Sequence, residues 1–242
     1  MTSREPMFNV PTVVLALLAA MAVVHGLRVF LPQGDSDWLT LALAFIPARY
    51  GSSAAELPGG EVAAVTSFVT HMLVHGDLTH LAINSAWLLA FGGAVANRIG
   101  AWRFLALSAV TGIAGAVLFL AVNPGLEAPM VGASGAVSGL MGATMRFLFS
   151  ALDEGGLWLL RVAPGSVRRM SLVETLRDRR ALIAIVVWLG INALASLGGG
   201  VFGVEAAIAW EAHVGGFIVG LAAFALFDRV NYGPTYRGSR AQ

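Results

Sequence analysis

The sequence predicts an all-α membrane protein built as a bundle of six transmembrane helices, with both termini in the cytoplasm. Three observations lead to this prediction. The 242 residues are 57% hydrophobic and only 12% charged, whereas about a quarter of the residues in a soluble domain are charged. Six apolar stretches are long enough to cross a ~30 Å hydrocarbon core. The basic residues, all of them arginine, gather on one predicted side of the membrane.

The first predicted span covers residues 12–31, after a short polar lead. A cleaved signal peptide is the alternative, but its apolar region would be shorter, and residues 21–25 offer no small-residue cleavage site. We therefore expect an uncleaved helix. The next stretch, residues 32–61, is interrupted by charges and by Pro58-Gly59-Gly60, so it is predicted to be a loop with partly inserted helical pieces.

Five further apolar stretches complete the predicted bundle. They cover residues 78–95, 104–122, 131–148, 181–197 and 206–227. Residues 62–73 are apolar but too short to span, and the arginine-rich segment 152–180 is predicted to be a connecting loop. The whole chain, 1–242, is predicted to be a single membrane domain. The core of this domain is predicted to cover about residues 10–230, and residues 228–242 are predicted to form a polar cytoplasmic tail.

The distribution of arginine sets the predicted orientation. With six spans, only Arg28 and Arg49 fall on one side of the membrane, and the other arginines fall on the side that holds both termini. Cytoplasmic loops are enriched in Lys and Arg, so both termini are predicted to be cytoplasmic. The second, fourth and sixth spans then run inward, which places their first residues at a common depth near the outer face.

Polar side chains occur near the starts of these three spans. They are His80 and Asn84 in the second span, Ser134 in the fourth and His213 in the sixth. Polar groups in hydrocarbon are costly and usually face the bundle interior, so a cluster at one depth is a candidate site. The alternative is helix packing, because Gly132-Ala133-Ser134-Gly135 and Gly216-x-x-x-Gly220 are small-residue patterns that let helices approach closely.

Ser134 and His213 have the chemistry of a nucleophile and its base. A serine hydroxyl is almost fully protonated at neutral pH and needs an adjacent base to attack a carbonyl carbon. A neutral histidine supplies that base and later donates the proton to the leaving amine. Glu211 is only two residues from His213 and is expected to point away from it on a helix, so the sequence offers no acid to complete a triad.

His80 and Asn84 are spaced i,i+4 and therefore share one helix face. One interpretation is a hydrogen-bonded pair that holds helices together. The other is an oxyanion hole, in which both side chains donate to the developing negative oxygen and the backbone N–H of Ser134 adds a third donor.

These motifs resemble those of the rhomboid family of intramembrane serine proteases. The matches are Gly132-Ala133-Ser134-Gly135, Ala212-His213-x-x-Gly216-x-x-x-Gly220 and His80-x-x-x-Asn84. The resemblance implies a rhomboid-like six-helix bundle with a Ser134–His213 catalytic dyad, in which His80, Asn84 and the Ser134 backbone N–H stabilise the oxyanion. It also implies cleavage of transmembrane protein substrates near the outer membrane face, with no cofactor and no metal ion.

Three positions bear on how closely the chain follows this family. Many members carry a tyrosine four residues after the serine, where it stacks on the catalytic histidine, and this chain has Ser138 there. The loop after the first span often holds a Trp-Arg pair, which is absent from this chain. His75 matches a histidine often found at that position and is expected to be structural.

The expected partners are transmembrane protein substrates and membrane lipid, with no nucleic acid. The chain has no cysteine, which excludes disulfides and thiol chemistry. Its excess of arginine, together with abundant alanine and glycine, is typical of a GC-rich bacterial source. The bacterial inner membrane is therefore the expected location.

Three other interpretations fit the sequence less well. A catalytically inactive relative that binds membrane clients does not require Ser134, His213, His80 and Asn84 together, yet this chain has all four. A metal site at His71-x-x-x-His75, with His80 nearby, lacks a carboxylate in a metalloprotease pattern. A transporter or channel is favoured by broken helices and paired acidic residues within the spans, and neither occurs in this sequence.

Overall fold

The fold is described by a computed structural model in which residues 10–51, 56–196 and 209–229 are placed. These residues form helices joined by short connections, and they contain one isolated β-bridge, between Phe45 and Met130. Five helices among them are long and apolar enough to cross a membrane: Thr12–Phe30, Leu78–Ile99, Ala101–Val122, Ser134–Glu154 and Trp210–Phe227. The predicted all-α membrane fold is therefore confirmed.

Four of the predicted spans correspond to single helices. They are α1 (Thr12–Phe30), α6 (Ala101–Val122), α7 (Ser134–Glu154) and α11 (Trp210–Phe227). Residues 206–208 of the predicted sixth span lie outside the described residues. Helix α7 begins three residues later than the predicted span, so Ser134 is its first residue. This start matters for the site, because the first N–H groups of a helix have no carbonyl acceptor within the helix.

The second span is longer than predicted and is not a continuous α-helix. Helix α4 (Leu78–Trp87) continues through the π-helical turn η3 (Leu88–Gly92) into α5 (Gly93–Ile99). The predicted fifth span corresponds to α10 (Arg179–Ser196). Its last predicted residue, Leu197, lies outside the described part of the chain.

The segment predicted to be a partly inserted loop folds into a helical cap at one end of the bundle. It contains α2 (Gln33–Leu43) and η1 (Pro47–Tyr50), and α3 (Gly60–Thr70) and η2 (His71–Leu73) follow. The buried guanidinium of Arg49 donates to the carbonyl oxygens of Leu41, Pro58 and Gly60. A buried charge needs such partners. These hydrogen bonds connect the end of α2 to the start of α3 and so stabilise the cap.

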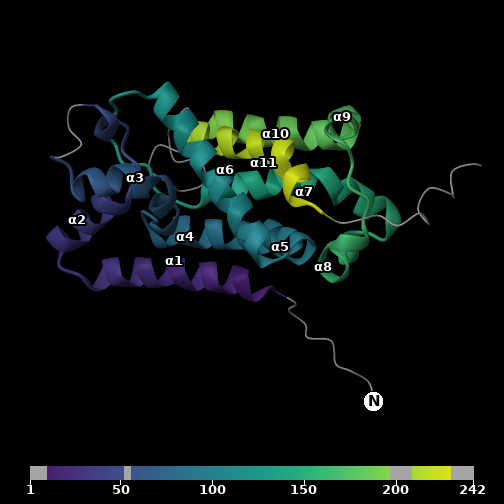
Figure 1. The fold of residues 1–242 in the computed structure, drawn as a ribbon, viewed down its shortest axis with the longest axis horizontal. Coiled ribbons are helices and arrows are strands. Elements are labelled where there is room, and N and C mark those ends of the chain that lie inside the picture. Colours follow the sequence, from purple (N-terminus) through teal and green to yellow (C-terminus); the bar gives the residue numbers. More distant parts are fainter. Residues whose placement is uncertain (1–9, 52–55, 197–208, 230–242) are drawn as a thin grey trace, which may run out of the picture.

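Figure 1 shows α2 and α3 at one end of the molecule, and α8 (Leu157–Val162) and α9 (Leu172–Arg177) at the other. Buried arginines hold the second end. The Arg98 guanidinium on α5 donates to the carboxylate of Asp228, 2.9 Å away at the end of α11. Arg146 on α7 donates to the carbonyl oxygens of Leu221 and Met170. These bonds join α5, α7 and α11, three helices that are separated in sequence.

Helix α7 runs through the centre of the bundle. In an apolar 18-residue stretch of this helix 83% of the residues are buried, compared with 11% in the corresponding stretch of α1. Glycines allow this burial, because they let α11 approach α7 backbone to backbone. A Cβ built on Gly216 would lie 2.8 Å from the carbonyl carbon of Gly135, and one built on Gly142 would lie 2.5 Å from the carbonyl oxygen of Phe217. The predicted close approach at Gly216 is therefore confirmed.

Candidate active site

Ser134 and His213 are in direct contact. The Ser134 Oγ lies 2.7 Å from the His213 Nε2. Ser134 begins α7, and His213 lies in the first turn of α11. The small residue after the serine makes this contact possible, because a Cβ on Gly135 would already be 3.2 Å from the Ala212 carbonyl oxygen. The two helices thus meet closely enough for the side chains at their starts to form a hydrogen bond.

Gly132 shapes the approach to Ser134. Its φ of +114° lies in a region that side chains other than glycine rarely adopt, and a Cβ there would be 2.6 Å from the His80 Nε2. The same Cβ would be 3.8 Å from the Ser134 Oγ. The imidazole of His80 therefore lies beside the loop that leads into Ser134. The Gly132 N–H donates to the carbonyl oxygen of His71 across 2.9 Å, which fixes this loop.

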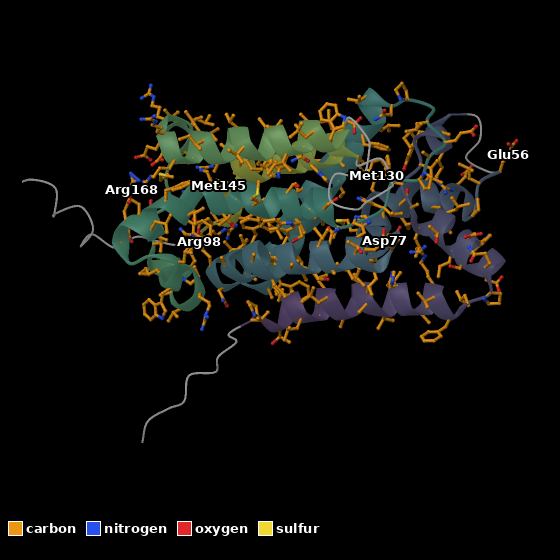
Figure 2. The ribbon with its side chains drawn as sticks, turned by 180° about the vertical axis from the view of Figure 1, so that it is seen from behind. Glu56, Asp77, Arg98, Met130, Met145 and Arg168 are labelled. Carbon is orange, nitrogen blue, oxygen red and sulfur yellow. The ribbon has the colours of Figure 1, made fainter. Side chains whose placement is uncertain are left out.

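Asp77 positions His80 from the start of α4. Its carboxylate accepts a hydrogen bond from the backbone N–H of His80 across 2.8 Å, as an N-cap residue does. Figure 2 shows Asp77 and Met130 toward one end of the long axis, and Arg98 and Arg168 toward the other. The starts of α4 and α7, with their polar side chains, thus belong to the same end of the bundle.

Asn84 is buried one turn after His80. Its Nδ2 donates to the His80 carbonyl oxygen across 2.9 Å, and one of its two amide hydrogens suffices for that bond. The Asn84 Oδ1 is a buried atom without a hydrogen-bond partner among the described residues. A buried amide that keeps a spare hydrogen and an unpaired oxygen is unusual in a helix interface. This arrangement leaves hydrogen-bonding capacity for a further group.

The start of α7 contributes an electrostatic element. No side chain caps this helix at Ala133. The first N–H groups of a helix have no intrahelical acceptor, and a helix N-terminus carries a partial positive charge. The Ser134 backbone N–H is therefore available to a negatively charged oxygen.

Asn192 on α10 also contacts His213 and was not among the site residues predicted from the sequence. The Asn192 Oδ1 lies 2.7 Å from the His213 Nδ1, on the side of the ring opposite Ser134. One signal was available: Asn192 is a polar residue inside the apolar stretch 181–197, close to its end. A span that runs outward ends at the same depth as the start of a span that runs inward, so the predicted orientation places Asn192 at the depth of Ser134 and His213.

Glu211 and Ser138 lie apart from this arrangement of side chains. The Glu211 carboxylate accepts a hydrogen bond from the Asn123 Nδ2 across 2.9 Å, which links the start of α11 to the end of α6. Ser138 is buried on α7, one turn after Ser134.

His71 and His75 do not share one helical face, as a metal site at His71-x-x-x-His75 would need. Helix α3 ends at Thr70 and the turn η2 at Leu73, and Val74 has extended backbone, which separates the two histidines. The His71 Nδ1 lies 2.7 Å from the Ser67 carbonyl oxygen. The ring of His75 packs edge-on against that of His80, with centroids 5.1 Å apart. Burial lowers the pKa of His75 to about 4, so its ring is neutral at pH 7.

Comparison with known proteins adds an independent observation. A family profile described as the Rhomboid domain matches residues 63–229, more than half of the chain. The chain is 38% identical over 89 residues to the "Putative rhomboid protease YdcA" of Bacillus subtilis (strain 168). This alignment covers 37% of the chain and 43% of that protein. It is 34% identical over 91 residues to the "Rhomboid protease GluP" of the same organism. This second alignment covers 38% of the chain and 17% of that protein. The matched segments thus span less than half the length of either relative.

Proposed function

The chain belongs to the rhomboid family and is a multi-pass integral membrane protein, and we propose that it is an intramembrane serine endopeptidase. The observation that carries the proposal is the 2.7 Å distance between the Ser134 Oγ and the His213 Nε2. A serine within hydrogen-bond reach of a histidine is the arrangement that activates the hydroxyl as a nucleophile. The relatives' names, a putative rhomboid protease and a rhomboid protease, point to the same class of reaction.

In the proposed reaction, His213 removes the proton from the Ser134 hydroxyl as the oxygen attacks the carbonyl carbon of the scissile peptide bond. The carbonyl oxygen becomes negatively charged in the tetrahedral intermediate. His213 then donates its proton to the leaving nitrogen, and the C–N bond breaks to leave an acyl ester on Ser134. A water molecule, deprotonated by His213, then attacks the ester carbonyl carbon. The bond between this carbon and the Ser134 Oγ breaks, the proton passes from His213 to the Ser134 Oγ, and the second product leaves.

The oxyanion in this scheme is stabilised by the backbone N–H of Ser134 and by the side chains of His80 and Asn84. The free N–H at the start of α7, the position of His80 beside Gly132 and the spare amide hydrogen of Asn84 support these roles. Donors that are fixed before the reaction stabilise the developing charge without reorganising during it.

The proposed topology is one membrane domain, residues 1–242, with six spans and both termini in the cytoplasm. Helix α10 is the remaining span. All arginines except Arg28 and Arg49 then fall on the cytoplasmic side, as the positive-inside rule requires. In this orientation the end of the bundle marked by Arg98 and Arg168 in Figure 2 is cytoplasmic, and Ser134 lies near the outer face. The proposed location is the bacterial inner membrane.

The proposed substrates are transmembrane proteins, cleaved near the outer face of the membrane. The carbonyl groups of a transmembrane helix are already hydrogen-bonded within the helix. A substrate must therefore unwind locally before Ser134 reaches a carbonyl carbon. Helix-destabilising residues near the cut and a small side chain at the scissile position are the expected preferences.

The test uses purified protein in detergent with a fluorescently labelled transmembrane substrate. We expect cleavage by the wild type and its loss in Ser134→Ala and in His213→Ala. The matched control is Ser138→Ala, which removes a hydroxyl one turn further along α7 and should retain activity. Cleavage that persists in Ser134→Ala would rule out the serine mechanism. If a chelator abolished that cleavage, the activity would belong to a metal site instead.

A catalytically inactive rhomboid-like protein that binds membrane clients is the alternative function. It predicts that the wild type and Ser134→Ala bind the same labelled substrate equally and that neither cleaves it. Pull-down and cleavage measured on the same samples separate the two functions.

A further inference from the structure

We infer that Asn192 positions the base of the dyad, so that catalysis depends on a hydrogen-bonded chain Ser134–His213–Asn192. The inference rests on the proposed function, since it gives Asn192 a task only if His213 acts as the base. It adds a third residue, and a third helix, to the dyad. The supporting observations are the hydrogen bonds of the Asn192 side chain, its burial and the packing of α10 against α11.

The amide of Asn192 has one orientation that satisfies both of its ends. The Nδ2 lies 2.9 Å from the carbonyl oxygen of Trp188, and the Oδ1 lies 2.7 Å from the His213 Nδ1. A carbonyl oxygen only accepts hydrogen bonds, so the amide nitrogen must face Trp188. The opposite orientation would place two oxygens against each other. The Asn192 oxygen is therefore held toward the histidine.

This orientation selects the tautomer of His213. The Asn192 Oδ1 accepts hydrogen bonds, so the His213 Nδ1 carries a proton and donates it to that oxygen. In the neutral ring the Nε2 is then unprotonated, and its lone pair accepts the hydrogen bond from the Ser134 hydroxyl. That is the state in which a histidine acts as a general base. Without an acceptor at the Nδ1, the other tautomer would leave the Nε2 unable to take the proton from Ser134.

Burial makes this hydrogen bond costly to lose. Asn192 is only 6% exposed, although neighbouring side chains on α10 face outward, among them Leu189, Ile191 and Leu194. A polar amide turned away from water needs its hydrogen bonds satisfied inside the protein. Both ends of the Asn192 amide are satisfied, one by its own helix and one by His213.

A second contact fixes the register of α10 against α11. The ring of Trp188 stacks on that of Phe217, with centroids 4.5 Å apart and planes 24° from parallel. Trp188 precedes Asn192 by four residues, and Phe217 follows His213 by four, so the two contacts are successive turns of one antiparallel helix pair. Aromatic packing at one turn thus holds the amide in place at the next. Many rhomboids carry a tyrosine against the histidine at the position of Ser138. Serine is too small to stack on the ring, so in this chain the side chain that orients His213 comes from α10.

The experiment compares Asn192→Ala and Asn192→Asp with the wild type and with Leu189→Ala, a control that truncates an outward-facing side chain of the same helix. The readouts are kcat, KM and the pH dependence of kcat for Ser134-dependent cleavage. We expect Asn192→Ala to lower kcat about tenfold with little change in KM, since a hydrogen bond that orients the base is lost. Leu189→Ala should match the wild type.

Asn192→Asp separates positioning from a structural role. A carboxylate accepts the same hydrogen bond and also stabilises the imidazolium ion, so the variant should keep most of the activity at neutral pH. The negative charge favours the protonated ring, and the acid limb of the kcat profile should move to higher pH by about one unit. If Asn192 only packs, Asn192→Ala would lower the amount of folded protein and leave kcat per folded molecule unchanged, so that Asn192→Asp would have no loss of kcat to restore. The Asp variant also carries the test if Asn192→Ala does not fold.

Two outcomes overturn the inference: kcat within twofold of the wild type in Asn192→Ala, or an acid limb that does not move in Asn192→Asp. Both are read against wild-type cleavage that Ser134→Ala abolishes. If the wild type does not cleave, or cleaves without Ser134, the proposed function itself is wrong. The two failures are therefore distinguishable in one set of measurements.

Discussion

Gly220 on α11 lies so close to Gly139 on α7 that a Cβ built on Gly220 would overlap the Gly139 carbonyl group and come within 2.6 Å of the Gly139 Cα. Real Cβ atoms essentially never approach another heavy atom within 3.0 Å. The obstacle is backbone, which cannot swing aside as a flexible side chain does. This contact lies about two turns below the dyad, and it sets the separation at which Ser134 reaches His213.

Replacing Gly220 with alanine should therefore force the two helices apart. Overpacking of a tight interface costs about 1–3 kcal/mol, and the displacement also lengthens the distance between Ser134 and His213. We expect Gly220→Ala to unfold at lower temperature in detergent and to lose most of its cleavage activity. Gly190→Ala on α10 is the control, since nothing lies within 4 Å of its added Cβ. Equal stability and activity in the two variants would contradict this account of the interface.

Asn84→Ala tests the oxyanion role of the second span. Removal of one oxyanion donor typically lowers kcat about 10²–10³-fold, so we expect a fall in that range with little change in KM. Ile83→Ala truncates a partly exposed neighbour on the same helix and should behave as the wild type. If Asn84 only holds helices together, the variant will lose stability, while kcat per folded molecule stays unchanged. Thermal unfolding and steady-state kinetics on the same preparations measure both.

Asp228→Ala should be among the most destabilising changes at the cytoplasmic end of the proposed topology. Its carboxylate pairs with Arg98 at 2.9 Å and with Arg169 at 3.1 Å, and its side chain is 1% exposed. Removing one member of a buried ion pair leaves an uncompensated charge and costs about 3–5 kcal/mol. Arg168→Ala breaks a pair with Glu174 that is 42% and 46% exposed, and such pairs contribute about 0–1 kcal/mol. Similar unfolding temperatures for the two variants would contradict the prediction.

His71 should make the stability of the fold depend on pH. Burial lowers its pKa to about 4, against the smaller opposing effect of the hydrogen bond to Ser67. In the unfolded chain a histidine has a pKa of about 6.5. As the pH falls, the unfolded chain therefore binds the proton first, and stability that is complete above about pH 6.5 is lost progressively toward pH 4.

Unfolding temperatures measured between pH 7.5 and 5 check this dependence. His71→Gln removes the titrating group, so the fall in stability with pH should be less steep in this variant. At pH 5.5 the variant should avoid a loss of about 1 kcal/mol in the free energy of unfolding. The remainder belongs to other groups, including His75, whose pKa burial also lowers to about 4. A slope in His71→Gln equal to that of the wild type would show that the His71 ring is not buried in the folded protein.

The helical membrane fold was predictable because hydropathy alone marks segments that must satisfy their backbone groups internally. The proximity of Ser134 and His213 followed from a second, independent signal. Arginine fixed the direction of each span, and direction fixed the depth of each polar residue. The structure has the two side chains 2.7 Å apart, while their catalytic roles are the subject of the proposal.

Local features that hydropathy does not register were not predictable. The π-helical turn Leu88–Gly92 changes hydrogen bonding and not composition. The extended backbone at Val74, which separates His71 from His75, lies at the end of an apolar stretch and has no signal in hydropathy. For Asn192, the depth in the membrane was predictable from the direction of its span, but the helix face on which it lies was not. The apolar residues of α10 surround it on all sides of the helix, so no pattern indicates which face meets α11.

Residues 124–129 are exposed, and they lead from α6 toward Ser134 without entering the packing of the central helices. Backbone bonds anchor the chain after this stretch, where Met130 pairs with Phe45 and Gly132 donates to His71. Exposed loops tolerate substitution and insertion far better than packed helices do. Substitutions in this loop should therefore cost less stability than substitutions at Gly216 or Gly220, where an added Cβ would meet the backbone of α7. Under the proposed function, this loop is a stretch next to the site whose sequence can change without moving Ser134 away from His213.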